Sequence, residues 1–143
     1  MEKTDDIYEV LDSLGLTDKE ILSISKRNKL IFSNTKDEVN NIIDFFKIKC
    51  NFSKDEIATL IINNPFILNE EPARINILAN IYDELGFSEG EYKEYVKNYD
   101  RAFSLNPKMV SESILTLIKS GNDLTNIKKI IIDNPTKVFN YSE

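Results

Sequence analysis

The 143-residue chain has no histidine and no tryptophan, and it contains one cysteine, four glycines and four prolines. Without histidine there is no Ser-His-Asp or Cys-His catalytic arrangement, and the commonest general base of enzymes is missing. A single cysteine, Cys50, excludes an internal disulfide and a Cys/His zinc site. The four glycines do not form a glycine-rich, phosphate-binding loop motif. We therefore expect a protein that is not an enzyme and that needs no cofactor or metal.

Long hydrophobic runs are also missing, because Lys, Asn or Asp interrupts every apolar stretch well short of the ~20 residues that span a membrane. The N-terminal stretch is polar and acidic, unlike a signal or transit peptide. Apolar residues make up 41% of the chain and charged residues 29%, as in globular proteins. We expect one domain over residues 1–143, located in the cytoplasm.

One pattern recurs four times along the chain, and repeats of this kind indicate a repeat architecture. The turn residues of the four copies stand 36, 35 and 35 positions apart: Gly15, Asn51, Gly86 and Gly121. The same spacing holds for the first core residue after each turn: Ile21, Ile57, Tyr92 and Ile127. It also holds for the apolar residue that closes each copy: Phe32, Leu68, Phe103 and Val138.

Each turn is followed by the start signal of a short helix. Three copies have a capping box, in which a Ser or Thr side chain and a Glu three residues later satisfy backbone N–H groups: Thr17 with Glu20, Ser53 with Glu56, and Ser88 with Glu91. The fourth copy lacks the Glu, and either Asp123 or Thr125 could cap its helix. Pro65 and Pro135 stop two of these helices, since proline is excluded from helix interiors.

A longer amphipathic segment precedes each turn, with apolar residues every three or four positions as on one face of a helix. Short apolar tails close each copy, and we expect them to form 3₁₀ turns that place Phe66–Leu68 and Val138–Phe139 in the core. The sequence thus predicts an all-α helical-repeat solenoid of about eight helices, with its handedness left open. The four units are expected over residues 5–33, 34–69, 70–104 and 105–141.

The segments LGLTDKEIL, FSKDEIATLIINNPFIL and LGFSEGEY resemble the repeat of the mitochondrial transcription termination factor (mTERF) family. That repeat has a Leu-Gly start, a short helix and a Pro-apolar-Leu hook. The similarity extends from about residue 5 to residue 141. It implies stacked helical units whose basic inner groove binds double-stranded nucleic acid.

The charges of this chain favour a different partner. Its 24 acidic residues outnumber its 18 basic residues, giving a net charge of −6, whereas nucleic-acid binding depends on Lys and Arg that neutralise phosphates. Acids are concentrated in the third copy, and we expect them to bind a basic protein surface: Asp83, Glu84, Glu89, Glu91 and Glu94. If the chain binds nucleic acid instead, the expected contacts are lysines of the fourth copy: Lys108, Lys128, Lys129 and Lys137.

Three further features have a functional and a structural interpretation. Cys50 could be a reactive thiol, but it stands where other copies have leucine, which favours a buried residue. Tyr92, Tyr95 and Tyr99 could stack nucleic-acid bases, although their spacing is that of a helix core. The acidic pairs Asp83/Glu84 and Glu70/Glu71 could form a catalytic dyad, although they are more typical of solvated helix ends.

Overall fold

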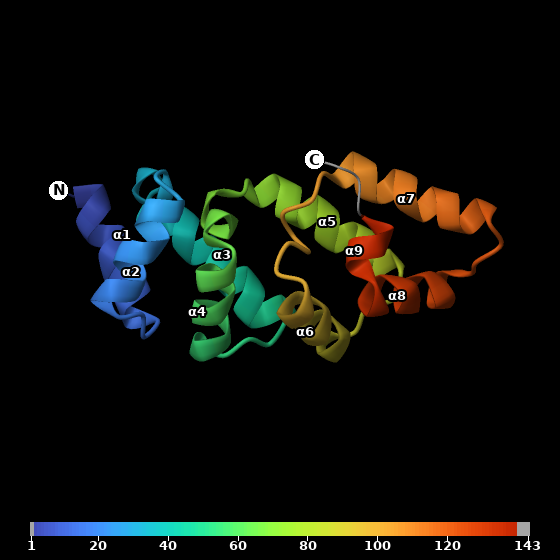
Figure 1. The fold of residues 1–143 in the computed structure, drawn as a ribbon, viewed down its shortest axis with the longest axis horizontal. Coiled ribbons are helices and arrows are strands. Elements are labelled where there is room, and N and C mark those ends of the chain that lie inside the picture. The colour runs from blue at the N-terminus through green and yellow to red at the C-terminus, as the bar shows by residue number, and fades with distance from the viewer. Residues whose placement is uncertain (1, 140–143) are drawn as a thin grey trace. The chain divides into compact units, whose positions relative to one another are not determined.

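The protein is all-helical over the part of the chain that its computed structural model describes, which is the backbone of residues 2–139 and the side chains of residues 6–139 (Figure 1). The chain divides into two compact units, Met1–Pro72 and Ala73–Glu143. Each unit contains two copies of the repeat. Every copy consists of a longer helix, a turn, a ten-residue helix and a short closing segment, as the sequence predicts.

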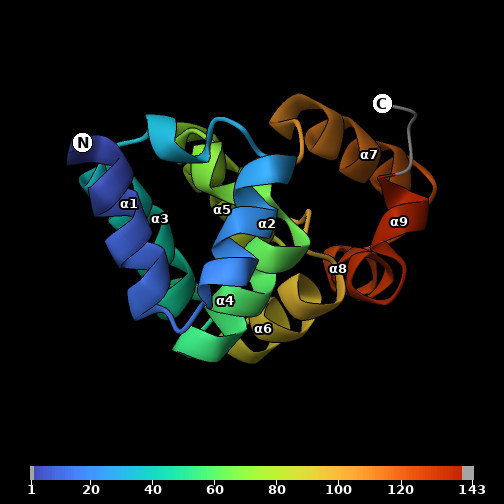
Figure 2. The same cartoon turned by 60° about the vertical axis from the view of Figure 1, so that its left-hand side comes forward.

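The first unit contains four helices in two layers. Its helices and short 3₁₀ segments are α1 (Glu2–Ser13), α2 (Asp18–Arg27), η1 (Ile31–Ser33), α3 (Lys36–Lys49), α4 (Lys54–Asn63) and η2 (Pro65–Asn69). The two longer helices, α1 and α3, lie side by side, and α2 and α4 lie side by side next to them (Figure 2). The core between the layers is mainly aliphatic, with Ile7, Leu11, Ile24 and Ile31 fully buried.

The second unit repeats this order with α5 (Pro72–Glu84), α6 (Glu89–Asn98), α7 (Pro107–Lys119), α8 (Leu124–Asp133) and α9 (Pro135–Val138). Its core is aromatic. The rings of Tyr82 and Tyr95 lie 5.3 Å apart, centroid to centroid, and Phe103 is equally far from Tyr82. The Tyr82 hydroxyl donates to the Ala102 carbonyl at 2.6 Å and accepts from the Tyr95 hydroxyl at 3.0 Å, so both buried phenols are satisfied.

The turns between paired helices adopt the left-handed backbone conformation that the repeat predicts. Gly15, Gly86 and Gly121 have φ angles of 95°, 89° and 97°, and Asn51 has a φ of 56°. Only glycine, and to a lesser degree asparagine, adopts this region at low cost. The common turn geometry explains why these four positions keep one spacing along the chain.

The predicted capping boxes are all present, and the structure adds one more. Thr17, Ser53 and Ser88 each accept from the backbone of the Glu three residues later, and that Glu accepts from the capping residue. A fourth box, Thr35 with Glu38, starts α3; its Thr-x-x-Glu pattern was readable but not predicted. In the last copy Asp123, rather than Thr125, caps α8, accepting from Asn126 N at 2.8 Å.

The closing segments are less uniform than predicted. Two are 3₁₀ turns, the third is a hydrogen-bonded turn at Asp100–Phe103, and the fourth is the short helix α9. Pro65 and Pro135 follow their helices directly, as expected, because each is the first residue of the next segment. Ile67, Leu68 and Phe139 are buried, but the prediction for Phe66 is wrong, since its side chain is 51% exposed. Val138 is only half-buried.

In the first unit a buried asparagine joins the two closing segments. Asn28 is 1% exposed, and its side-chain amide donates to the Pro65 carbonyl at 3.0 Å and to Asn69 Oδ1 at 2.6 Å. The Asn69 amide in turn donates to the Leu30 carbonyl at 3.1 Å. These bonds connect the closing segment after α2 with the closing segment after α4 through the backbone carbonyls of Leu30 and Pro65.

Candidate functional site

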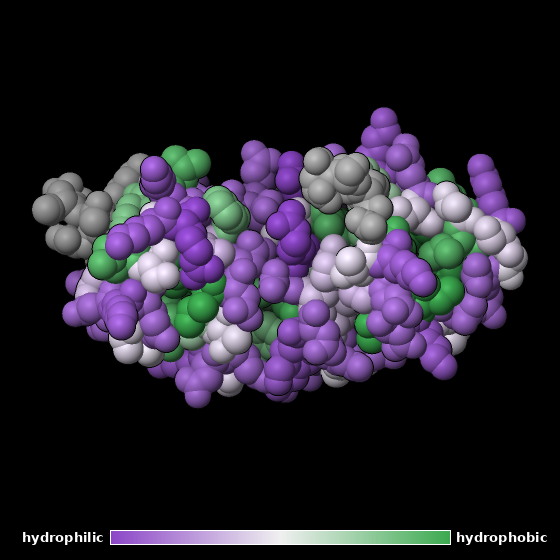
Figure 3. All heavy atoms as spheres, viewed as in Figure 1, coloured by the Kyte–Doolittle hydropathy of each residue, from purple (hydrophilic) through white to green (hydrophobic). Residues whose placement is uncertain are grey.

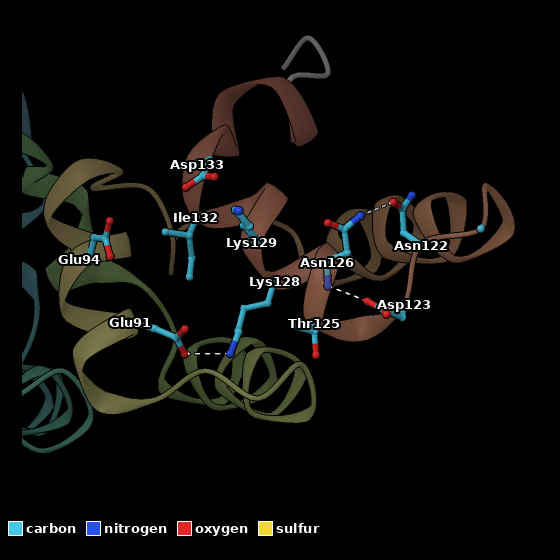
Figure 4. Close-up of a pocket in the computed structure, with 11 residues that line it drawn as sticks. Glu91, Glu94, Asn122, Asp123, Thr125, Asn126, Lys128, Lys129, Ile132 and Asp133 are labelled. Carbon is cyan, nitrogen blue, oxygen red and sulfur yellow. Dashed lines mark hydrogen bonds and ion pairs between the residues drawn. The ribbon is translucent and has the colours of Figure 1, made fainter.

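A polar groove of about 710 Å³ opens between α6 and α8 in the second unit (Figure 4). We call it the α6–α8 groove. Glu91 and Glu94 line it from α6, and the other lining residues come from the turn before α8 and from α8 itself: Gly121, Asn122, Asp123, Thr125, Asn126, Lys128, Lys129, Ile132 and Asp133. It is continuous in its lining with a second hollow of about 590 Å³, because Glu94, Ile132 and Asp133 border both.

One wall of the groove is fixed by the capping box of α6. Glu91 Oε1 accepts from Ser88 N at 2.9 Å, and it accepts from Lys128 Nζ of α8 at 3.1 Å. Lys128 also donates to the Gly86 carbonyl at 3.2 Å. The Ser88 N–H, and then the Lys128 ammonium, hold the pKa of Glu91 below its ordinary value, although partial burial acts in the opposite direction.

The end of the groove near the turn is ordered by local hydrogen bonds. Asp123 caps α8, and the Asn126 amide donates to Asn122 Oδ1 at 2.6 Å. The Asn122 amide donates to the Leu117 carbonyl at 3.0 Å, so it also closes the end of α7. These side chains are therefore held in place by the fold, and they present a rigid polar edge.

The middle of the groove contains charges that the fold does not neutralise. Glu94 stands on α6 opposite Ile132 and Asp133 of α8, with Lys129 beside them (Figure 4). Within residues 6–139, the side chains of Glu94, Asp133 and Lys129 form no ion pair or side-chain hydrogen bond. The adjoining hollow adds Lys137. The two carboxylates and two ammonium groups give a balanced surface, suited to hydrogen-bonding partners of either sign and unsuited to concentrating anions.

The structure separates the five acidic residues predicted to bind a partner. Glu91 and Glu94 both line the α6–α8 groove. Asp83 accepts from the Tyr92 hydroxyl at 2.6 Å and so supports the core. Glu84 and Glu89 are exposed and lie outside the groove lining.

The lysines predicted as alternative nucleic-acid contacts are also divided. Lys128 and Lys129 line the groove, but the Lys128 ammonium is bonded to Glu91 and Gly86. Lys137 lines the adjoining hollow. Lys108 is exposed on the first turn of α7 and borders neither cavity.

The cysteine and the tyrosines that had two possible interpretations belong mainly to the core. Cys50, Tyr92 and Tyr95 are buried, and Tyr99 is half-buried. Glu70 and Glu71 line a small pocket of about 140 Å³ in the first unit.

Among the described residues, no cluster of three or more His, Cys, Asp or Glu side chains is arranged to hold a metal ion. No helix in that part of the chain has the length and apolar character needed to cross a membrane.

Sequence reasoning missed the polar residues that complete the groove: Asn122, Thr125, Asn126 and Asp133. A signal was available, because residues 122, 125, 126, 129 and 133 follow the three- and four-residue steps of one helix face. That face is polar, whereas the opposite one contains the buried Ile127 and Ile131. A polar face alone does not distinguish a groove from a solvated surface, and only the packing of α6 against α8 makes it concave.

Paired helices with common caps, turns and closing segments define a helical-repeat protein. The chain belongs to the mTERF family, whose family model matches residues 2–142. A search of curated proteins finds no match. The family assignment agrees with the repeat resemblance seen in the sequence and covers nearly the whole chain.

Proposed function

We propose that this mTERF-family chain is a non-enzymatic helical-repeat protein that binds a protein partner through the α6–α8 groove. The observation that carries the proposal is the pairing of Lys128 with Glu91, which neutralises one of the two cations that line the groove. Glu94 and Asp133 then remain opposite each other as hydrogen-bond acceptors. Helical repeats commonly present extended concave surfaces of this kind to other proteins.

The chemistry of the groove favours a polypeptide segment with basic and amide side chains. Glu94 and Asp133 suit a Lys or Arg of the partner, because charge-assisted hydrogen bonds to carboxylates are strong. Thr125 and Lys129 are exposed along the same wall, where they can bond backbone carbonyls of the partner. The half-buried Ile132 offers a small apolar contact between the two carboxylates.

The proposal can be tested by capturing partners from nuclease-treated lysate of the native cells on immobilised protein. We expect a protein to be retained after nuclease digestion, and we expect the double variant Glu94→Lys/Asp133→Lys to lose it. Glu84→Lys is the matched control, because Glu84 is an equally exposed acid outside the groove. Loss of all retained protein after nuclease treatment, or equal loss with Glu84→Lys, would refute binding in this groove.

A second candidate function is nucleic-acid binding, and membership of the mTERF family favours it. Of the lysines predicted as nucleic-acid contacts, Lys108, Lys129 and Lys137 are exposed and would have to contact phosphates. Neutralising only three phosphates gives weak binding that decreases with salt. Titration with duplex DNA and RNA, described at the end of the Discussion, separates this function from the first.

A further inference from the structure

An apolar strip lies on the outer face of α7. Leu115 is 52% exposed and Ile118 is 43% exposed, in a helix whose other face buries Val110 and Ile114. Lys108, Ser111, Leu115 and Ile118 follow one another at steps of three, four and three residues, which places them on one exposed face. Figure 3 shows hydrophobic residues at the surface near α7 and α8, among hydrophilic ones.

The corresponding face is polar in the preceding copy of the same unit. Counting back 35 residues, α5 has Asn80 in place of Leu115 and Asp83 in place of Ile118. Both α5 residues are exposed, so exposure alone does not select apolar residues at these positions. Leu115 and Ile118 therefore form an apolar patch that the preceding copy lacks at the same positions, and exposed apolar patches mark surfaces that bind other molecules.

We propose that two copies of this chain associate through α7, with the two helices antiparallel. The charges flanking the strip carry the choice of partner and orientation. Glu112 and Lys119 are both exposed, lie on the same side of the strip and stand equally far from its centre between residues 115 and 116. A two-fold axis through that centre places Glu112 of each copy opposite Lys119 of the other.

The same arrangement brings the apolar residues of the two strips together. Leu115 lies at the centre, where it meets its own equivalent, and Ile118 of one copy lies beside the small Ser111 of the other. In a parallel arrangement the flanking side of one copy lies at the opposite edge of the interface from the same side of the other copy, so Glu112 and Lys119 would form no contacts with each other. The contact is made by a single helix face, so it buries less than a standard interface of about 1,200–2,000 Å², and the dimer is expected to dissociate on dilution.

The apolar part of the proposal is tested by sedimentation equilibrium over about 10 µM to 1 mM protein, where small interfaces associate. We expect a monomer–dimer equilibrium whose dissociation constant rises at least about tenfold in Leu115→Ser, because each dimer loses two buried leucines. Ile77→Ser is the matched control, since Ile77 is 49% exposed on α5 of the same unit. A monomer at every concentration, or equal effects of the two variants, would contradict the proposal.

The orientation is tested by charge reversal. Glu112→Lys and Lys119→Glu each replace two attractive contacts by two repulsive ones, and each variant alone should dimerise about three- to tenfold more weakly. The double variant should dimerise like the wild type. A mixture of the two single variants should form a heterodimer, because both of its contacts are then attractive. Weak association of the double variant would exclude the antiparallel arrangement, and unchanged circular dichroism of all variants serves as the folding control.

Discussion

The two units use the same helix caps and turns but stabilise their interiors differently. The first unit has a mainly aliphatic core, and Asn28 and Asn69 link its two closing segments by hydrogen bonds to backbone carbonyls. The second unit replaces this link by buried tyrosines, whose hydroxyls bond one another and the backbone of the third closing segment. Caps and turns recur because they satisfy local backbone groups that every copy has, whereas the core side chains differ between the two units.

The same contrast explains where the groove lies. At the position of Asn28, the third copy has Tyr99, which ends α6 with its ring stacked on Tyr95 at 6.0 Å between centroids. Tyr99 has no side-chain amide, so the link made by Asn28 does not recur at this position. The polar residues that line the α6–α8 groove lie between the two helices, where Lys128 and Glu91 form an ion pair.

The largest expected effect is on the aromatic core. Tyr82 contacts Phe87, Tyr92, Tyr95 and Phe103, and Tyr82→Ala should lower the free energy of unfolding by about 3–5 kcal/mol, as aromatic-to-alanine changes in cores do. Tyr82→Phe keeps the ring and removes only the hydrogen bonds, and should cost about 1–2 kcal/mol. Urea denaturation measures both. Equal costs would show that the hydroxyl network, rather than ring packing, holds the second unit together.

The closing segment of α4 provides the next test, in the first unit. Leu68 is 1% exposed, and Leu68→Ala should cost about 2–5 kcal/mol through lost burial and the cavity it leaves. Phe66→Ala, two residues away, should change stability by less than about 0.5 kcal/mol because its ring is half exposed. A urea midpoint unchanged by Leu68→Ala would mean that this segment does not contribute to the core.

The asparagine link gives a smaller effect that is specific to the first unit. Asn28→Ala removes the buried amide that donates to the Pro65 carbonyl and to Asn69 Oδ1, at a cost of about 1–3 kcal/mol. Asn134 occupies the same position in the last copy but is exposed, so Asn134→Ala should cost much less. Denaturation of the two variants side by side measures the difference. Similar costs would remove the distinction drawn between the two units.

The smallest effect is a pH dependence from Glu91. Its pKa is lowered in the folded state, so its ionised form contributes stability above the ordinary value of 4.5, and this contribution is lost as the pH falls through the lowered pKa. The difference in stability between wild type and Glu91→Gln should be under about 1 kcal/mol at neutral pH and shrink below pH 4.5. Urea denaturation of both proteins over a range of pH measures this difference. Burial raises the pKa of Asp100, so the pH dependence of its contribution to stability has the opposite sign: the contribution is lost as the pH rises through the raised pKa.

Local rules account for most of what the sequence predicted about the fold. A capping residue and its Glu are three residues apart, so the Ser53–Glu56 box could be recognised directly. A left-handed turn needs one suitable residue, so Gly86 could be recognised in the same way. The Asn28–Asn69 and Glu91–Lys128 contacts could not, since their partners stand 41 and 37 residues apart. Spacing along the chain gives the position of each residue within its copy without showing which side chains meet.

The third closing segment illustrates the same limit. Its sequence has no proline, and Ala102 and Phe103 are buried without forming a 3₁₀ helix. The backbone there is fixed by the Tyr82 hydroxyl, which donates to the Ala102 carbonyl and so joins α5 to this segment. The candidate site was predicted only in part for a similar reason, because Glu91 and Glu94 were recognisable as acids but their concave setting depends on α8.

The most direct test of the central proposal, protein binding in a groove that does not attract phosphates, is a fluorescence anisotropy titration. Labelled duplex DNA and RNA are titrated with the protein near physiological salt, where a Debye length of about 8 Å limits attraction to nearby charges. We predict no binding with a dissociation constant below about 1 µM, because Lys128 is paired and Glu94 and Asp133 oppose Lys129 and Lys137. Binding tighter than about 1 µM that weakens steeply as salt is raised, and that Lys129→Glu abolishes, would contradict the proposal and establish nucleic acid as the partner.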